Sequence, residues 1–410
     1  MKVVQINATF GNGSTGTIVK DIQTKCLENG IENKVVYSLS SIPQTVINGY
    51  RMGSYLDRKL HALLSRVNGM QGYFSSYSTY KLIKWLETES PDALHLHNLH
   101  SNYINLPVLL KWAAKKNVAV IITLHDCWFF TGGCFHYTSS DCNKWQISCG
   151  ECPRKKKDYP SLLFDRSKKI LTDKRKLFGA ISNLTIVGVS KWTAEEASKG
   201  IFKDRNCIYI YNGIDTSIFK PTITHIRTKY GLDEKFVVLG PASKWFMEAN
   251  KNLLREFEKL GDDYMLVLYG CKGDGRRFSD NIITIGFSSN KEELARLYSM
   301  ADIFVNCTHE DTFSMINAEA QACGTPVICY NNTGAKETVN TNFGRLVETD
   351  DVKGMINAIK NLKVYISSLD KNKKQQVRNI LSQWAEDNFN KEINYNKYLK
   401  LYHSVIKQTC

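Results

Sequence analysis

The sequence lacks any apolar run long enough to cross a bilayer, which takes about 18–20 residues. Its best interior stretch, Val118 to Leu124, is long enough only for a buried strand. The beginning of the sequence, MKVVQINATFGNGS, lacks the apolar core of a signal peptide and becomes glycine-rich at once. Low-complexity segments and repeats of about 20–50 residues are also missing. From these absences we expect a cytoplasmic globular protein.

Acidic residues are scarce relative to basic ones. The 410 residues include 54 Lys and Arg against 40 Asp and Glu, a net charge of +14. Such an excess favours an anionic partner: nucleic acid, anionic lipid or a phosphorylated ligand. The 43% of hydrophobic and 23% of charged residues exclude a disordered or fibrous chain. The length is too great for one ordinary core and predicts two domains.

Short apolar runs alternate with longer amphipathic stretches along both halves of the chain, which predicts doubly wound α/β domains with parallel sheets. A helix after the first strand is expected to bury Ile18, Ile22 and Leu27 on one face. The pattern breaks near residues 203–222, and two helical segments are predicted within 372–408. The predicted strands are 2–6, 34–39, 93–96, 118–124 and 184–189 in the first half and 236–240, 264–269, 282–285, 303–306 and 326–330 in the second.

A glycine-rich loop follows the first predicted strand. Gly11, Gly13 and Gly16 have the spacing G-x-G-x-x-G and precede a helix, an arrangement that lets backbone N–H groups approach a diphosphate. A plain tight turn is the alternative. A nicotinamide dinucleotide site would also need an acidic residue at the end of the second strand, and residues 35–41 contain none. The loop therefore favours some other diphosphate.

Two carboxylates flank the start of a predicted helix in the second half. Asp311 precedes a helix that begins near Ser314 and ends at Gly324, and Glu319 lies about two turns inside it. A ligand at this helix N-terminus would meet unpaired N–H groups, the helix dipole and both carboxylates. Alternatively, Asp311 only caps the helix and Glu319 lies on a solvated face.

This segment resembles the C-terminal signature of family 4 glycosyltransferases, retaining enzymes that use sugar nucleotides and have the GT-B fold. The signature has a carboxylate, seven residues, then Glu, Ala, two residues and Gly-x-Pro-Val; Asp311 stands where the family usually has Glu. Further similar motifs are Asn212 to Thr216, Phe219 to Pro221, Val187 to Ser190, Ala301 to Val305, and Gly334 with Glu337. The runs from His97 to Pro107 and from His125 to Trp128 resemble a subgroup found in colanic-acid, O-antigen and capsule clusters.

The resemblance implies two Rossmann-like domains that face a cleft holding the donor. We assign residues 1–203 to an acceptor-side domain with a Cys-rich insertion at 127–157, and 204–371 to a domain that binds the nucleotide sugar. Residues 372–410 are assigned to C-terminal helices that pack back toward the N-terminal domain.

The resemblance also implies roles for individual residues. Glu319 would hold the nucleotide ribose, and Asp311 or Glu310 the donor sugar hydroxyls. Lys251 corresponds to the diphosphate lysine of the family, and Lys244 is the best substitute for its Arg partner. His125 matches the histidine near the anomeric centre. The remaining implied donor contacts are the backbone N–H groups of Phe313, Ser314 and Met315, with Gly13 and Gly16 bordering the diphosphate.

The departing nucleotide builds up negative charge, which a helix dipole and cations can stabilise without a metal. The sequence contains no Asp-x-Asp, the spacing of metal-dependent glycosyltransferases of the other fold. We therefore expect no catalytic cofactor and assign no covalent nucleophile.

Four of the twelve cysteines lie close together in the sequence, at Cys134, Cys142, Cys149 and Cys152. Four thiolates can close a tetrahedral zinc site and stabilise a long polar loop. We predict a structural zinc here; free reduced thiols and disulfides are the alternatives, and a cytoplasmic location disfavours disulfides.

A basic segment follows, with ten Lys or Arg within residues 151–177 against four acids. It predicts docking on the anionic inner membrane, where a polyprenyl-diphosphate-linked saccharide acceptor would lie; a solvated helix face is the alternative. Nucleic acid is not expected as a partner, since no interleaved aromatics or nucleic-acid-binding pattern accompany the basic residues.

Taken together, the sequence predicts a glycosyltransferase that adds a sugar from a nucleoside-diphosphate sugar to a lipid-linked saccharide of an O-antigen, lipopolysaccharide or capsule pathway. A degenerate partner subunit of the same fold and a nicotinamide-dependent oxidoreductase are the alternatives.

Overall fold

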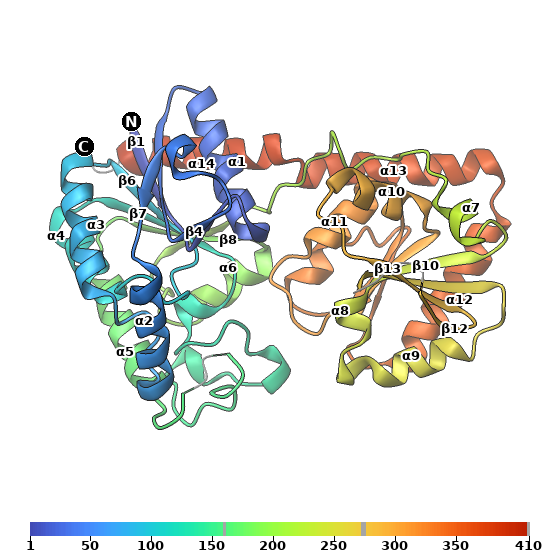
Figure 1. Cartoon of the computed structure of the whole chain (residues 1–410), viewed down its shortest axis with the longest axis horizontal. Helices are drawn as coiled ribbons and strands as arrows, with labels where there is room; N and C mark the ends of the chain where they lie inside the picture. Colours follow the sequence, from blue (N-terminus) through green and yellow to red (C-terminus); the bar gives the residue numbers. More distant parts are fainter. Residues whose placement is uncertain (159–160, 272–275, 408–410) are drawn as a thin grey trace. The chain divides into compact units, whose positions relative to one another are not determined.

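The computed structural model describes residues 1–158, 161–271 and 276–407. The chain divides into two compact units: unit 1 contains Met1–Asn212 together with the chain from Glu392 onward, and unit 2 contains Gly213–Lys391. Each unit has its own seven-stranded sheet with helices around it (Figure 1). The boundary at Asn212 and Gly213 lies within the break that the sequence predicts at residues 203–222.

The sheet of unit 1 has the order β5-β3-β1-β6-β7-β8-β9, and every neighbouring pair is parallel. A separate parallel pair joins β2 to β4. The strands are β1 (Lys2–Ile6), β2 (Thr9–Phe10), β3 (Glu32–Tyr37), β4 (Leu39–Ser40), β5 (Gly49–Arg51), β6 (Ala93–Leu96), β7 (Ala119–Leu124), β8 (Leu184–Gly188) and β9 (Asn206–Tyr209).

Helices bury apolar residues on both faces of this sheet, which is why its central strands read as continuous apolar runs. Val3 and Ile121 belong to a core cluster with α1 and α14, whereas their neighbours Val4 and Ile122 belong to another with α3 and α4. The helices are α1 (Gly13–Glu28), α2 (Tyr55–Asn68), α3 (Ser76–Glu89), α4 (Leu106–Lys116), α5 (Ser167–Gly179), α6 (Lys191–Ser198) and α14 (Lys391–Lys407), with 3₁₀ turns at Gln44–Val46, Trp128–Phe130, Thr138–Ser140 and Lys144–Gln146.

One predicted core position of α1 is wrong. Ile18 and Ile22 are buried as expected, but Leu27 is 47% exposed. Cys26 occupies the next buried position, four residues after Ile22, which is the helical repeat of that face. The prediction placed the apolar stripe one residue too late.

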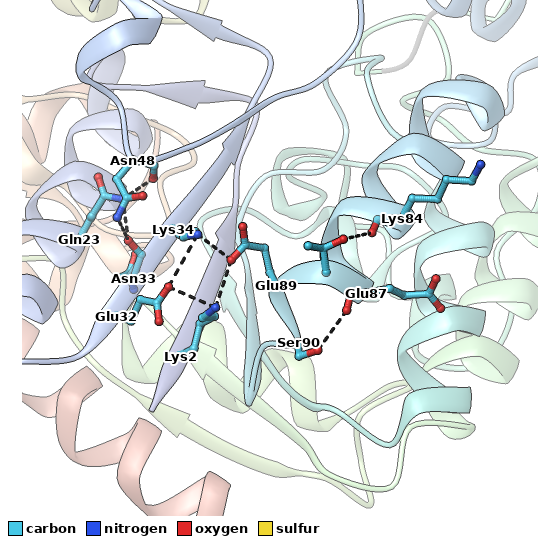
Figure 2. A network of polar contacts seen from close by, with 11 residues as sticks. Lys2, Gln23, Glu32, Asn33, Lys34, Asn48, Lys84, Glu87, Glu89 and Ser90 are labelled. Atoms are coloured by element: carbon cyan, nitrogen blue, oxygen red, sulfur yellow. Dashed lines mark hydrogen bonds and ion pairs between the residues drawn. The ribbon is translucent and has the colours of Figure 1, made fainter.

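An ion-pair network joins the end of α3 to the beginning of the sheet (Figure 2). The Glu89 carboxylate accepts from Lys2 Nζ at 3.1 Å and from Lys34 Nζ at 2.6 Å, and Lys2 also pairs with Glu32 at 3.2 Å. Only 13% of the Glu89 side chain is exposed, so these lysines compensate a carboxylate that is largely out of water.

Unit 2 has the strand order β12-β13-β11-β10-β14-β15-β16, parallel except for β12 with β13. Its strands are β10 (Phe236–Pro241), β11 (Tyr264–Cys271), β12 (Arg276–Ser279), β13 (Ile282–Gly286), β14 (Ile303–Asn306), β15 (Val327–Tyr330) and β16 (Arg345–Val347). Its helices are α7 (Ile226–Tyr230), α8 (Ala242–Trp245), α9 (Lys251–Glu258), α10 (Lys291–Met300), α11 (Met315–Ala322), α12 (Val352–Ser368) and α13 (Lys371–Phe389), with 3₁₀ turns at Glu248–Asn250 and Gly334–Thr338.

The two C-terminal helices belong to different units. In α13, Arg378 donates from Nη2 to the carbonyls of Ser299 at 2.8 Å and Cys323 at 3.1 Å, which holds this helix within unit 2. In α14, the Tyr398 and Tyr402 side chains are buried in the core of unit 1. The segment predicted as one block at 372–410 therefore divides near Lys391, and only the part after it packs on the N-terminal sheet.

All ten predicted strands are confirmed to within two residues at each end. The strands that were not predicted have two to four residues each and lie at the sheet edges or in the separate β2–β4 pair, so they lack the continuous apolar runs of the central strands. Within the described ranges, no helix is both long enough and apolar enough to cross a membrane.

Candidate active site

Both sheets have a point at which the strand order reverses direction. In unit 1 it lies between β1 and β6, and in unit 2 between β10 and β14. Open α/β sheets bind ligands beyond the carboxyl ends of the strands at such points, because the two flanking loops diverge there. The glycine loop follows β1, Lys244 follows β10, and Glu310 and Asp311 follow β14. The glycine loop therefore lies at the switch point of unit 1, and Lys244, Glu310 and Asp311 lie at that of unit 2, whereas His125 follows β7.

The loop after β14 is fixed through the backbone of Asp311. Its N–H donates to Thr333 Oγ1 at 3.2 Å, and its carbonyl accepts from Thr333 Oγ1 at 2.7 Å and from the N–H of Gly334 at 3.1 Å. Thr333 has a positive φ of 43°, a strained backbone for a β-branched residue. The hydrogen bonds between Thr333 and the backbone of Asp311 compensate for this strain, because they fix the loop that carries Asp311 and Glu310.

The helix α11 begins and ends as predicted. Ser314 is its N-cap residue, and Gly324, at φ +80°, follows its C-terminal cap. The Ser314 side chain does not cap the helix, because its Oγ accepts from Asn306 Nδ2 at 2.9 Å instead. Asp311 Oδ1 accepts from the N–H of Phe313 at 3.3 Å, which is a local turn outside α11. The Ser314 side chain therefore leaves the first turn of α11 without an N-cap hydrogen bond.

Glu319 is the fifth residue of α11, little more than one turn inside it rather than two. Its Oε2 accepts from Tyr298 OH at 3.0 Å, and Tyr298 OH lies 3.2 Å from Tyr269 OH. Burial raises the pKa of Glu319 to about 7, although the Tyr298 hydroxyl acts in the opposite direction. Glu319 is partly exposed and its carboxyl is hydrogen-bonded, so it does not lie on a fully solvated face. Its carboxyl can change charge near neutral pH.

Asn250 joins the loops of the two strands at the switch point. Its Nδ2 donates to the carbonyls of Lys244 and Cys307, each at 2.9 Å, and Asn250 is buried. Tyr330 OH, at the end of β15, donates to Asn250 Oδ1 at 3.3 Å. Asn250 was not predicted as a site residue, because a single Asn near a helix start carries no spacing signal. It places Lys244 beside the loop that follows β14.

The second predicted cation has a different environment. Lys251 is the first residue of α9, half of its side chain is exposed, and its Nζ lies 3.1 Å from Glu248 Oε1. This is a surface ion pair of little strength, so it leaves Lys251 able to turn toward another anion. Lys244 is the more buried of the two lysines.

In unit 1, histidines stack beyond the carboxyl ends of β6 and β7. His97 Nδ1 lies 3.0 Å from His125 Nε2, and the two rings are stacked with centroids 5.3 Å apart. His97 Nε2 lies 3.1 Å from Gln5 Oε1 on β1. Burial lowers the pKa of His125 to about 4 and that of His97 well below its ordinary value, so both rings are neutral near pH 7.

His95 and His100 have structural partners in this region. His95 Nδ1 lies 2.7 Å from Tyr402 OH on α14, and its Nε2 lies 2.7 Å from Thr123 Oγ1. His100 Nε2 lies 2.8 Å from Asp126 Oδ2, and the N–H of Trp128 donates to Asp126 Oδ1 at 2.8 Å. These contacts fix the loops that carry His97 and His125.

The glycine loop adopts backbone conformations that favour glycine. Gly11 and Gly13 have positive φ values of 71° and 64°, which side-chain-bearing residues rarely adopt. A Cβ at Gly16 would lie 2.8 Å from Thr9 Oγ1 and 3.3 Å from the backbone N of Gly11. Gly13 is also the first residue of α1, so the loop leads directly into a helix N-terminus, as a diphosphate site requires.

Two of the four clustered cysteines are in contact. Cys134 Sγ lies 3.8 Å from Cys152 Sγ, close to the separation of about 3.8 Å between two thiolates that each lie ~2.3 Å from one zinc. Burial raises the pKa of Cys149 to about 11, and the nearby Cys152 and Cys142 thiols add to that shift. Among the described residues, no three His, Cys, Asp or Glu side chains converge closely enough to hold a metal. Four cysteine thiolates are suitable ligands for zinc. To bind one ion, the four sulfur atoms would have to lie closer together than they do here.

Two residues of the basic segment are not on the surface. Lys174 is fully buried, with its Nζ bonded to the carbonyls of Trp128 and Thr131. Arg154 is 3% exposed and pairs with Asp158 at 2.8 Å. The prediction that all ten cations form one surface patch is wrong for these two, because they hold the Cys-rich insertion together. The exposed cations of the segment are Lys156, Lys157, Lys168, Lys169, Arg175 and Lys176.

The units match two family models. The model described as glycosyl transferases group 1 matches residues 225–379, and that described as glycosyltransferase family 4 matches residues 58–218. WcaC of Escherichia coli strain K12, named as a colanic acid biosynthesis glycosyl transferase, is 27% identical over 379 residues, which is 87% of this chain and 89% of WcaC.

Solved structures have the same fold over nearly the whole length. Sucrose-phosphate synthase from Thermosynechococcus elongatus is 16% identical with a TM-score of 0.68, covering 99% of each chain. Anabaena Alr3699/HepE, solved in complex with UDP, is 15% identical with a TM-score of 0.68, covering 98% of this chain and 100% of that one. The chain belongs to the family 4 glycosyltransferases and has their GT-B fold.

Proposed function

We propose that this glycosyltransferase moves a sugar from a nucleoside-diphosphate sugar to a saccharide carried on polyprenyl diphosphate, with retention of anomeric configuration. The observation that carries the donor proposal is the first turn of α11. Ser314 leaves it uncapped, and Asp311 and Glu319 lie on its two sides in the sequence. An uncapped helix N-terminus at a switch point is a ready site for an anion. HepE, of the same fold, has been solved with UDP bound.

The transfer step needs stabilisation of negative charge on the leaving diphosphate. In this proposal the dipole of α11 and the Lys244 ammonium supply this stabilisation. Lys251 contributes as well when its ammonium leaves Glu248 and pairs with the diphosphate. We also retain Gly13 and Gly16 as proposed contacts of the diphosphate. The step proceeds without a metal, a proposal that rests on the lack of an Asp-x-Asp sequence.

The carboxylates hold hydroxyl groups of the donor. In this proposal Glu319 accepts a hydrogen bond from the ribose. Burial alone favours the protonated carboxyl, and a ribose hydroxyl that donates to Glu319 favours the ionised form instead. Asp311 or Glu310 accepts from the sugar, on a loop that Thr333 fixes. His125 lies near the anomeric centre, where its neutral ring accepts or donates a hydrogen bond without adding charge.

The acceptor proposal rests on the similarity to WcaC and on the exposed cations of the basic segment. A lipid-linked saccharide of a surface polysaccharide lies at the cytoplasmic face of the inner membrane. A peripheral location there brings enzyme and acceptor together, and cations near an anionic surface strengthen such binding. We retain the structural zinc as a proposal for the Cys-rich insertion.

The test is donor hydrolysis followed by proton NMR. Purified protein is incubated with UDP-, GDP- and dTDP-sugars, and the anomeric signals of the released sugar are recorded before they equilibrate. Release of the sugar with the configuration of the donor supports retention. Glu319→Ala should abolish turnover, whereas Glu256→Ala, at an exposed ion pair on α9, should preserve it. Inverted product would contradict retention, and turnover unchanged in Glu319→Ala would contradict the proposed site.

A further inference from the structure

The burial pattern of the helix α2 is the reverse of that of an ordinary surface helix. Its fully buried positions are the polar residues His61 and Ser65. Its apolar residues are exposed instead, and they recur every three or four positions along one face. These are Leu56 (76% exposed), Leu60 (56%), Leu63 (58%), Leu64 (37%) and Val67 (37%).

Polar contacts, and not the leucines, attach α2 to unit 1. His61 Nε2 accepts from the N–H of Gly72 at 3.3 Å, so its Nδ1 carries the proton and donates to Ser75 Oγ at 2.9 Å. At the first turn, the Ser54 hydroxyl caps the helix by accepting from the N–H of Asp57 at 3.1 Å. The exposed leucine face therefore does not stabilise unit 1, and its composition calls for another explanation.

A second exposed apolar segment continues this face. The N–H of Leu162 donates to the carbonyl of Arg66 at 2.7 Å, which places the segment against the end of α2. Leu162, Leu163 and Phe164 are 75%, 65% and 45% exposed. We call α2 and residues 162–164 together the leucine surface. Contiguous exposed apolar residues of this kind mark an interaction site rather than ordinary surface.

Cations border the leucine surface. Lys59 Nζ lies 5.3 Å from the ring of the exposed Tyr55, and the Arg166 guanidinium lies 4.7 Å from the ring of Phe164. Arg66 is exposed at the other end of α2. Of the acids nearby, Asp165 is exposed but accepts from two backbone N–H groups, and Asp57 is half-buried. Leucines flanked by cations and amphipathic aromatics match the boundary between lipid headgroups and acyl chains.

We propose that the leucine surface binds the protein to a bilayer that contains anionic lipid, with the leucines at the level of the upper acyl chains and the cations at the headgroups. The proposal rests on the proposed function in one respect, since a lipid-linked acceptor gives the enzyme a reason to dock. It assigns docking to α2 and to residues 162–164 of the basic segment, whereas the sequence pointed only to the cations of that segment.

The test is flotation of purified full-length protein with vesicles of phosphatidylglycerol and phosphatidylethanolamine, compared with vesicles of phosphatidylcholine alone. The wild type should float with the anionic vesicles and bind the neutral ones roughly tenfold more weakly. Leu60→Ser/Leu63→Ser should lose flotation. Ile223→Ser/Val364→Ser, which removes two exposed apolar side chains from unit 2, should float like the wild type.

Thermal melting with and without UDP accompanies each variant. An unchanged melting temperature shows that the substitutions leave the fold intact, and an unchanged UDP shift separates loss of docking from loss of donor binding. Flotation of the Leu60→Ser/Leu63→Ser protein equal to that of the wild type would overturn the proposal. So would a wild type that fails to float, or one that forms a dimer which the same two substitutions dissociate.

Discussion

His97 Nδ1 lies 3.0 Å from His125 Nε2, and this contact fixes which nitrogen of His125 carries a proton. Gln5 Nε2 donates to the carbonyl of Val19 at 3.2 Å and to Asn33 Oδ1 at 2.9 Å, so its Oε1 must face His97. That oxygen can only accept, which puts the His97 proton on Nε2 and leaves Nδ1 as an acceptor.

We therefore predict that neutral His125 carries its proton on Nε2 and presents Nδ1 as an acceptor. Nitrogen-15 chemical shifts of histidine-labelled protein report the tautomer directly. Since burial lowers the pKa of His125 to about 4, the nitrogen-15 shifts of this neutral tautomer should persist from pH 8 down to about pH 5.

His61 provides a control in the same spectrum. It accepts at Nε2 from a backbone N–H, so it should be the opposite tautomer, with the proton on Nδ1. A His125 spectrum with a protonated Nδ1, beside a His61 that behaves as expected, would contradict the assignment.

Glu319 should make stability depend on pH in an unusual direction. Its pKa is about 7 in the folded protein against 4.5 as the ordinary value, so the folded state keeps a proton that the unfolded state has released between those pH values. Relative to Glu319→Gln, the wild type should lose about 2–3 kcal/mol of unfolding free energy as the pH rises from 4.5 to 7, at about 1.4 kcal/mol per unit.

Urea unfolding at a series of pH values measures this difference. Glu256→Gln, at an exposed ion pair, is the matched control and should follow the wild type. A difference between wild type and Glu319→Gln that stays constant across the range would show that Glu319 ionises normally.

Asn250 should matter for stability out of proportion to its size. Asn250→Ala leaves the buried carbonyls of Lys244 and Cys307 without their donor and should cost about 2–4 kcal/mol. Asn252→Ala, an exposed position on α9, should stay within about 0.5 kcal/mol of the wild type. Urea midpoints for unit 2 distinguish the two, and equal midpoints would mean that Asn250 does not join the two loops.

The four-cysteine cluster predicts bound zinc. Metal analysis of protein purified without chelator should find about one zinc per chain. Cys152→Ser should lower the zinc content and the melting temperature, because Cys152 lies beside Cys134. Cys207→Ser, outside the insertion, should change neither. Metal-free protein with four reactive thiols in the insertion would favour the alternative of reduced cysteines.

Most of the fold could be predicted because central strands of parallel sheets are continuous apolar runs. Contacts that join polar residues across such strands could not. Gln5 and His97 lie far apart in the sequence and meet only because β1 and β6 are neighbours. The burial of Lys174 was missed for a related reason. The sequence shows which residues are basic or apolar, but tertiary packing determines which face of a helix is buried.

In the candidate site, the motif spacing predicted that Asp311 precedes a helix and that Glu319 lies inside it, and both positions agree with the bounds of α11. It could not locate Asn250 or Tyr298, whose roles depend on the loops and helices brought together at the end of the sheet.

We propose above that the switch point of unit 2 binds a nucleoside diphosphate. The direct measurement is the melting temperature of the full-length protein with UDP, GDP, ADP, CMP, dTDP or NAD. A ligand at a hundred times its dissociation constant adds about 2.7 kcal/mol, a shift of a few degrees. We predict that nucleoside diphosphates of one base raise the melting temperature and that Glu319→Ala removes this shift. A shift with NAD alone, or with none of these ligands, would mean that unit 2 does not bind a nucleoside diphosphate at this switch point.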